Sequence, residues 1–79
     1  MKAKIYITLK KGVLDPQGKA VMGALETMGH KGVRDLRIGK FMEMEINSIS
    51  REDAEKEVKE MCERLLANTV IEDYRFEIE

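Results

Sequence analysis

Alternation of apolar and polar residues marks the first stretch of the chain, from Lys2 to Lys10. A period of two places every second side chain on the same face of an extended segment. One face is then apolar and the other is largely polar, as expected for a strand that is half-buried in a sheet. The apolar set is Ala3, Ile5, Ile7 and Leu9.

A change to helical spacing predicts a first helix over residues 16–28. Asp15 can accept hydrogen bonds from the first free N–H groups of this helix, and Pro16 suits its first position because proline has a fixed φ and no N–H. Gly29 supplies a left-handed stop. The apolar residues between these signals recur at helical spacing and are Val21, Ala24, Leu25 and Met28.

The stretch from Val33 to Ile46 predicts a second β-region, because its apolar residues share even parity up to Ile46. Gly39 and Lys40 interrupt this pattern. A three-residue turn, Gly39–Phe41, would form a hairpin with one apolar face, whereas a two-residue turn would set apolar residues against acidic ones. One long bent strand would satisfy the same parity, so the pattern leaves both arrangements open.

A second helix is predicted after Ser50, which has capping-box spacing to Asp53. We expect it to end near Ala67, with Asn68 in the left-handed conformation. Its apolar stripe consists of Ala54, Val58, Met61, Cys62, Leu65 and Leu66. A last alternating strand follows, with Tyr74, Phe76 and Ile78 on one side.

The element order β-α-β-β-α-β predicts an α+β fold of the ferredoxin-like kind, formed by residues 1–79 as a single domain. Such a domain has a four-stranded antiparallel sheet with both helices on one face, and its first strand lies between the third and the fourth. Lysines on the first strand would then face acidic residues on both neighbours, which stabilises a sheet by about 0.2–1 kcal/mol per pair. These residues are Lys2, Lys4 and Lys10 against Glu43, Glu45, Asp73, Glu77 and Glu79.

The small size of the chain, 79 residues, predicts a thin core. Small domains often gain stability from a disulfide, a metal or a partner subunit. One cysteine and one histidine support neither of the first two. We therefore expect a homo-oligomer, either a dimer or a tetramer.

The net charge argues against nucleic acid as a partner, and the length of the apolar runs argues against a membrane span. With 14 basic and 15 acidic residues the net charge is −1, so no long-range field favours nucleic acid. No apolar run approaches the roughly 18 residues that a membrane span needs. The N-terminus leads directly into a strand pattern and not into a signal sequence, so we expect a cytoplasmic protein.

No self-contained active site is indicated, because nucleophilic catalysis needs a nucleophile beside an oriented base. Cys62 lies on the apolar stripe of the second helix and is expected to be a buried, inert thiol. His30 follows a helix stop, where a solvated loop is expected. Asp15 and Glu26 are better explained as a cap and an exposed helix residue than as a catalytic pair. We predict no catalytic residue and no metal site.

Three segments carry a family resemblance: Leu9–Gly18 leading into Ala20 and Val21, Leu36–Lys40, and Cys62–Asn68 followed by Val70–Tyr74. Through them nearly the whole chain resembles the PurS family, the small subunit of phosphoribosylformylglycinamidine synthase. Thr69 is a departure, since the family usually has proline after the asparagine. We expect only a less rigid turn into the last strand.

The resemblance implies an accessory subunit of an ATP-dependent C–N ligase in de novo purine biosynthesis. In that complex a glutaminase subunit releases ammonia, and a large synthetase subunit uses ATP and Mg to add it to formylglycinamide ribonucleotide. The small subunit joins the two and helps to deliver ammonia; it binds no cofactor of its own and forms dimers or higher oligomers.

We expect partner contacts at the loop around the start of the first helix, at the Gly-Lys segment and at the exit of the second helix. The residues are Gly12, Asp15, Gln17, Gly18, Arg37, Lys40 and Asn68. The alternative is a ligand-sensing module similar to ACT domains, which share the element order. Residues 12–18 would then form a small-molecule site, an analogy that rests on topology alone.

Overall fold

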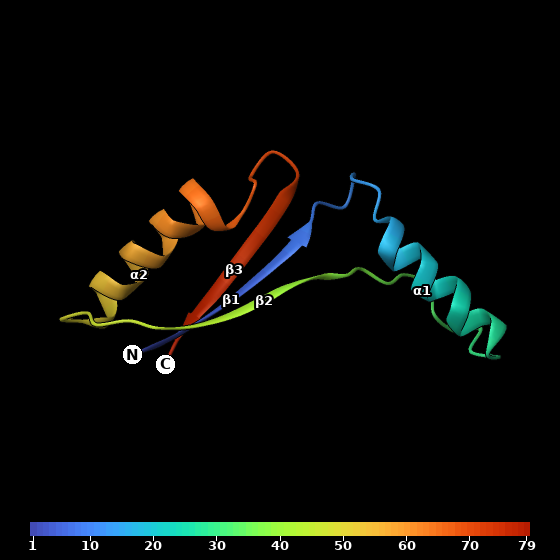
Figure 1. Cartoon of the computed structure of the whole chain (residues 1–79), viewed down its shortest axis with the longest axis horizontal. Helices are drawn as coiled ribbons and strands as arrows, with labels where there is room; N and C mark the ends of the chain where they lie inside the picture. Colours follow the sequence, from blue (N-terminus) through green and yellow to red (C-terminus); the bar gives the residue numbers. More distant parts are fainter.

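The computed structural model describes residues 1–79 and contains three strands and two α-helices. The elements in chain order are β1 (Lys2–Leu9), α1 (Pro16–Thr27), β2 (Gly39–Glu45), α2 (Arg51–Met61), a short π-helix η1 (Cys62–Leu66) and β3 (Glu72–Ile78). The strands form one antiparallel sheet in the order β2-β1-β3 (Figure 1). The predicted central position of the first strand is confirmed.

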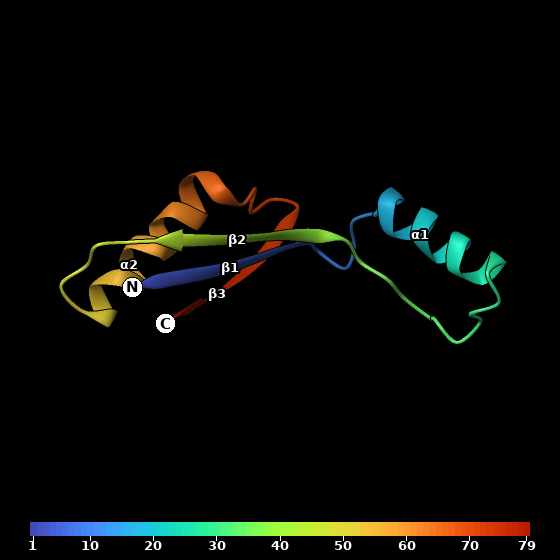
Figure 2. The same cartoon turned by 60° about the horizontal axis from the view of Figure 1, so that its bottom comes forward.

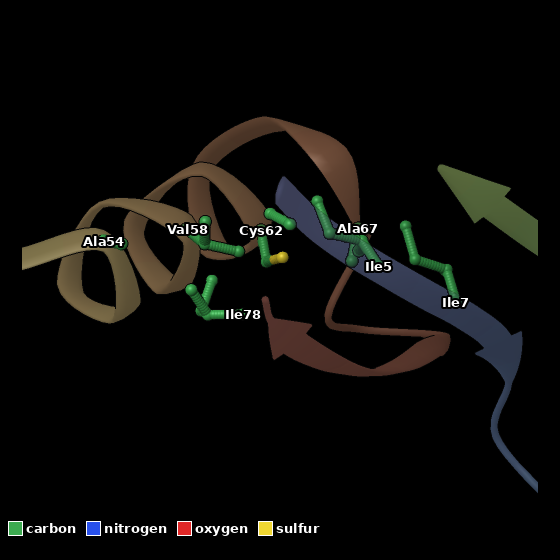
Figure 3. Packing of buried hydrophobic residues seen from close by; sticks show 8 residues of the cluster. Ile5, Ile7, Ala54, Val58, Cys62, Ala67 and Ile78 are labelled. Atoms are coloured by element: carbon green, nitrogen blue, oxygen red, sulfur yellow. The ribbon is translucent and has the colours of Figure 1, made fainter. Parts of the chain in front are cut away.

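The core lies between one face of this sheet and α2 with η1 (Figure 3). The alternation in β1 is confirmed, because Ala3, Ile5 and Ile7 are buried while their polar neighbours face away. From the helical side, the core receives Ala54, Val58, Cys62 and Ala67. Only eight apolar residues are buried, so the core is as thin as the chain length predicts.

The outer face of the sheet confirms the predicted pairing of opposite charges. Lys2 Nζ lies 3.5 Å from a carboxylate oxygen of Glu43 on β2, and Lys4 Nζ lies 2.7 Å from one of Glu79, directly after β3. Both pairs are partly exposed, and each contributes on the order of 1 kcal/mol or less to stability. They favour the observed strand neighbours.

The predicted four-stranded sheet is wrong, because the sheet has three strands. Residues 33–38 are not hydrogen-bonded into it, and Gly39, Lys40 and Phe41 begin β2 instead of forming a turn. At Gly39 a Cβ would clash with the carbonyl of Ile7, so this glycine allows β2 to approach β1 closely. Neither predicted arrangement of residues 33–46 is observed, because no hairpin forms and the strand covers only Gly39–Glu45.

The second correction concerns α1, which does not lie on the sheet beside α2. It projects beyond the end of the sheet as a separate arm (Figures 1 and 2), and Gly18 is its only buried residue. The radius of gyration is 15.9 Å, whereas a compact chain of this length has about 12 Å. The extents are 50 × 24 × 14 Å, so the molecule is a body with an arm.

The exit of the second helix also differs from the expectation. The π-helix adds one residue to the last turn, and the N–H of Ala67 donates to the carbonyl of Cys62 five residues earlier. This extra residue turns Leu65 outward, where it is 83% exposed, and directs Ala67 into the core. Asn68 does not have a positive φ, and its side chain instead accepts a hydrogen bond from the N–H of Val70.

Two glycines of α1 give a matched stability test. A Cβ at Gly18 would clash with the carbonyl of Leu36, whereas a Cβ at Gly23 meets nothing. We expect Gly18→Ala to lower the free energy of unfolding by about 1–3 kcal/mol. Gly23→Ala should raise it by about 0.4–1 kcal/mol, because alanine restricts the unfolded chain. Urea denaturation followed by circular dichroism measures both, and equal effects would contradict the packing at Gly18.

Candidate functional site

Two chain segments connect the body to the arm, residues 9–18 leading out and residues 36–40 leading back, and we call them the neck (Figure 2). Asp15 holds the two segments together. One carboxylate oxygen accepts the N–H of Gly18 at 2.9 Å, which is the predicted helix cap, and the other accepts the N–H of Ile38 at 2.8 Å. Asp15 is only 4% exposed.

Arg37 makes the reciprocal connection from the returning segment. Its Nη2 donates to the carbonyl oxygens of Lys10 at 2.9 Å and Val13 at 2.8 Å, which close a turn in the outgoing segment. A longer contact of 3.5 Å reaches the carbonyl of Leu9. Each segment of the neck therefore supplies one charged side chain that binds backbone groups of the other.

Glu72 links the neck to the exit of the second helix. One carboxylate oxygen accepts the N–H of Asn68 at 2.7 Å, and the other lies 3.8 Å from Lys40 Nζ. The side chain of Glu72 is 14% exposed. This residue was not predicted, although one signal was available: it is a carboxylate with the same parity as the inward-facing Tyr74, Phe76 and Ile78.

The structure brings most of the predicted contact residues together. A hollow of about 360 Å³ at the body end of the neck is bordered by Asp15, Gln17, Lys40 and Glu72. Gly18 and Asn68 are hydrogen-bonded to residues that border it, and Arg37 reaches the carbonyl of Leu9 at its edge. Gly12 is exposed in the turn of the outgoing segment and stands apart. Of this set, Gln17, Lys40 and Asn68 are exposed and available to a partner.

Three members of the set stabilise the neck itself: Asp15 and Gly18 are buried, and Arg37 is half-buried. The side chains of Asp15 and Arg37 bind backbone groups within the neck, and Gly18 packs against the carbonyl of Leu36. They position the exposed residues and do not themselves present a free polar surface. The contact role predicted for these three residues stays a prediction.

The remaining chemistry of the chain is sparse. No group of three His, Cys, Asp or Glu side chains is arranged so that it could hold a metal ion. Cys62 is fully buried, and burial raises the pKa of its thiol. No helix combines the length and the apolar character that crossing a membrane requires.

The hydrogen bonds to Asp15 predict a pH dependence of stability. The N–H groups of Gly18 and Ile38, followed by the nearby charge of Arg37, hold the pKa of Asp15 below its ordinary value of 3.8. The stabilisation is therefore present above pH 3.8 and is lost as the pH falls through the lower pKa of the folded state. Asp15→Asn removes this contribution, because the amide cannot titrate and can accept at only one of the two positions.

We expect the difference in melting temperature between wild type and Asp15→Asn to be large at pH 7 and to shrink steadily below pH 4. Thermal unfolding followed by circular dichroism from pH 7 to pH 2.5 measures it. Glu26→Gln, at an exposed position of α1, is the matched control and should follow the wild type. A difference that stays constant with pH would show that the charge of Asp15 does not stabilise the neck.

Comparison with known proteins identifies the family. Residues 2–79 match the family model described as PurS, phosphoribosylformylglycinamidine (FGAM) synthase. The chain is 59% identical over 78 residues to the phosphoribosylformylglycinamidine synthase subunit PurS of Bacillus subtilis, covering 99% of this chain and 92% of the relative. It is 49% identical over 74 residues to the same subunit of Archaeoglobus fulgidus, covering 94% and 92%.

Solved structures agree with this assignment. Bacillus subtilis PurS superposes with a TM-score of 0.86 at 59% identity, covering 99% of this chain and 96% of that one. A chain of the PurLQS structure from Thermotoga maritima gives a TM-score of 0.89 at 33% identity, covering 96% and 93%. The chain therefore belongs to the PurS family, whose members are subunits of phosphoribosylformylglycinamidine synthase.

Proposed function

We propose that this chain is the assembly subunit of phosphoribosylformylglycinamidine synthase and has no active site of its own. It joins a glutaminase subunit to a large synthetase subunit and assists the transfer of ammonia between them. The observation that carries the proposal is the open shape: a small body and an arm leave more surface uncovered than a protein that works alone would. The likeness to a chain of the PurLQS structure supports the same role.

The uncovered surface can be expressed as an area. The chain exposes 5948 Å², whereas a compact monomer of 9.1 kDa exposes about 4,900 Å². The excess of about 1,000 Å² is close to the roughly 800 Å² that one partner contributes to a stable protein interface. The shape therefore favours at least one permanent partner.

The open arm supports the proposal that one of these partners is a second copy of the chain. An isolated helix of about 12 residues is marginal in water, and α1 has 12 residues with almost no tertiary packing. Its apolar stripe is left open, with Val21 39% and Met28 71% exposed. Covering this stripe with another copy would stabilise α1, so we propose a homo-oligomer, a dimer or a tetramer.

The chemistry of the reaction is assigned to the larger subunits. They use ATP and Mg, while this chain binds neither and works in the cytoplasm as part of the complex. The match to PurS spans residues 2–79 and argues against the alternative role as an ACT-like sensor. Within the complex, the exposed residues Gln17, Lys40 and Asn68 are the proposed contacts around the hollow at the neck.

Reconstitution tests the assembly role. The two larger subunits are mixed with and without this chain, and turnover of formylglycinamide ribonucleotide is measured with either glutamine or ammonia as the nitrogen donor. We expect glutamine-dependent turnover to require the chain and turnover from added ammonia to depend on it far less. Equal glutamine-dependent turnover without the chain would refute the proposal.

Charged substitutions on α1 test the homo-oligomer. The double variant Val21→Glu, Met28→Glu would bury two carboxylates in the proposed contact. We therefore expect the dissociation constant Kd of the homo-oligomer to rise at least about tenfold. Light scattering after gel filtration should then give a mass closer to 9.1 kDa. Lys19→Gln, on the opposite side of the helix, is the control. An unchanged mass for the double variant would show that this stripe is not the contact.

A further inference from the structure

The outer face of the sheet carries an aromatic cluster that lies outside the hydrophobic core. The chain has only four aromatic residues, and two of them, Tyr6 and Phe41, lie on this face as direct partners across β1 and β2. Their ring centroids are 5.0 Å apart, and Phe41 is 52% exposed. Both helices lie elsewhere, so no element of the chain covers these rings (Figures 1 and 2).

Arg75 completes the cluster from the other side of β1. It is the register partner of Tyr6 on β3, and its guanidinium carbon lies 3.8 Å from the centroid of the Tyr6 ring. The three residues thus form a row across all three strands. Aromatic residues and arginine are the types enriched at the centres of protein interfaces, where they contribute most of the binding energy.

A hollow of about 350 Å³ adjoins this row. No side chain fills the hollow at Gly39. A Cβ at this position would clash with the Ile7 carbonyl and with Thr8. Tyr6 and Phe41 border the hollow on one side, and Asp73 and Arg75 border it on the other. Its shape and apolar walls suit one inserted apolar side chain.

The charges at this hollow indicate which charged group a bound partner would carry next to the inserted apolar side chain. The side chains of Lys40 and Arg75 both border it and are 66% and 67% exposed. Arg75 uses only Nη1 for its ion pair with Glu77, and the ion pair of Lys40 with Glu72 is long, at 3.8 Å. Both cations therefore retain donors for a carboxylate. Nucleic acid does not fit, because the rest of this face carries Glu43, Glu45, Glu77 and Glu79.

We propose that this row and its hollow form a docking site for a segment of one of the larger subunits, which inserts an apolar side chain beside Phe41 and places a carboxylate between Lys40 and Arg75. The inference rests on the proposed assembly function. It adds a contact surface on the outer face of the sheet that borders the neck at Gly39 and Lys40 and does not include the open stripe of α1.

Two substitutions test the docking site while leaving the core intact. Phe41→Ser removes the exposed ring, and Arg75→Glu reverses the charge that would meet the carboxylate. Their controls are Ile49→Ser, which removes an apolar side chain that is 97% exposed away from this face, and Lys2→Glu, which reverses a charge at the far end of the same face. Circular dichroism and melting temperature establish that each variant folds.

The measured quantity is the Kd of each variant for the mixed larger subunits, obtained by biolayer interferometry. We expect Phe41→Ser and Arg75→Glu each to raise Kd about tenfold or more, while the two controls stay close to wild type. Wild-type affinity in both test variants would overturn the proposal. So would a changed mass of the variants alone in light scattering, because the occupant would then be a second copy.

The direct binding measurement separates this proposal from the assembly function. If the wild-type chain binds the larger subunits but glutamine-dependent turnover does not require it, the assembly function fails and the docking site is still tested by Kd. If turnover requires the chain but both variants bind normally, the docking site alone fails. If Phe41→Ser does not fold, the Kd of Arg75→Glu decides the outcome, because the Arg75 side chain is exposed.

Discussion

The structure depends on the neck, where two charged side chains connect two chain segments that share no regular secondary structure. Asp15 binds the N–H groups of Gly18 and Ile38, and Arg37 binds the carbonyl groups of Lys10 and Val13. Charge-assisted hydrogen bonds of this kind are about twice as strong as neutral ones. Because α1 has almost no other attachment to the body, these bonds set the direction of the arm.

The local features of this fold could be predicted, because each is encoded within a few neighbouring residues. The alternation of β1, the Asp15 cap, the stop at Gly29 and the buried stripe of Ala54, Val58 and Cys62 depend on side-chain spacing and on capping chemistry, and these are present in the structure. Leu65 belongs to the predicted stripe but is exposed, because the π-helix shifts the last turn. The central position of β1 could be predicted from charge, since its lysines need acidic neighbours on both sides.

Two of the wrong predictions, the four-stranded sheet and the packing of α1 on it, concern contacts between distant segments. A hairpin and a single extended run give residues 33–46 the same parity, and a glycine serves equally in a turn and in a close strand contact. The apolar stripe of α1 indicates that the helix packs against something, but periodicity does not distinguish its own sheet from another chain. Likewise, Arg37 and Glu72 bind groups far away in sequence, so their roles in the site could not be derived from local pattern.

The open shape links folding to assembly in this protein. A body with eight buried apolar residues and an arm with one buried glycine gain little stability within the chain itself. A partner that binds the folded form and not the unfolded form adds RT ln(1 + [L]/Kd) to the stability, which rises with the logarithm of the free partner concentration once that concentration exceeds Kd. A closed monomer, with α1 folded over its own sheet, would gain this stability alone and would cover the surface that partners need. The neck holds the arm away from the body and keeps that surface uncovered. Burial of this surface then stabilises the complex with partners in the synthase and not the isolated chain.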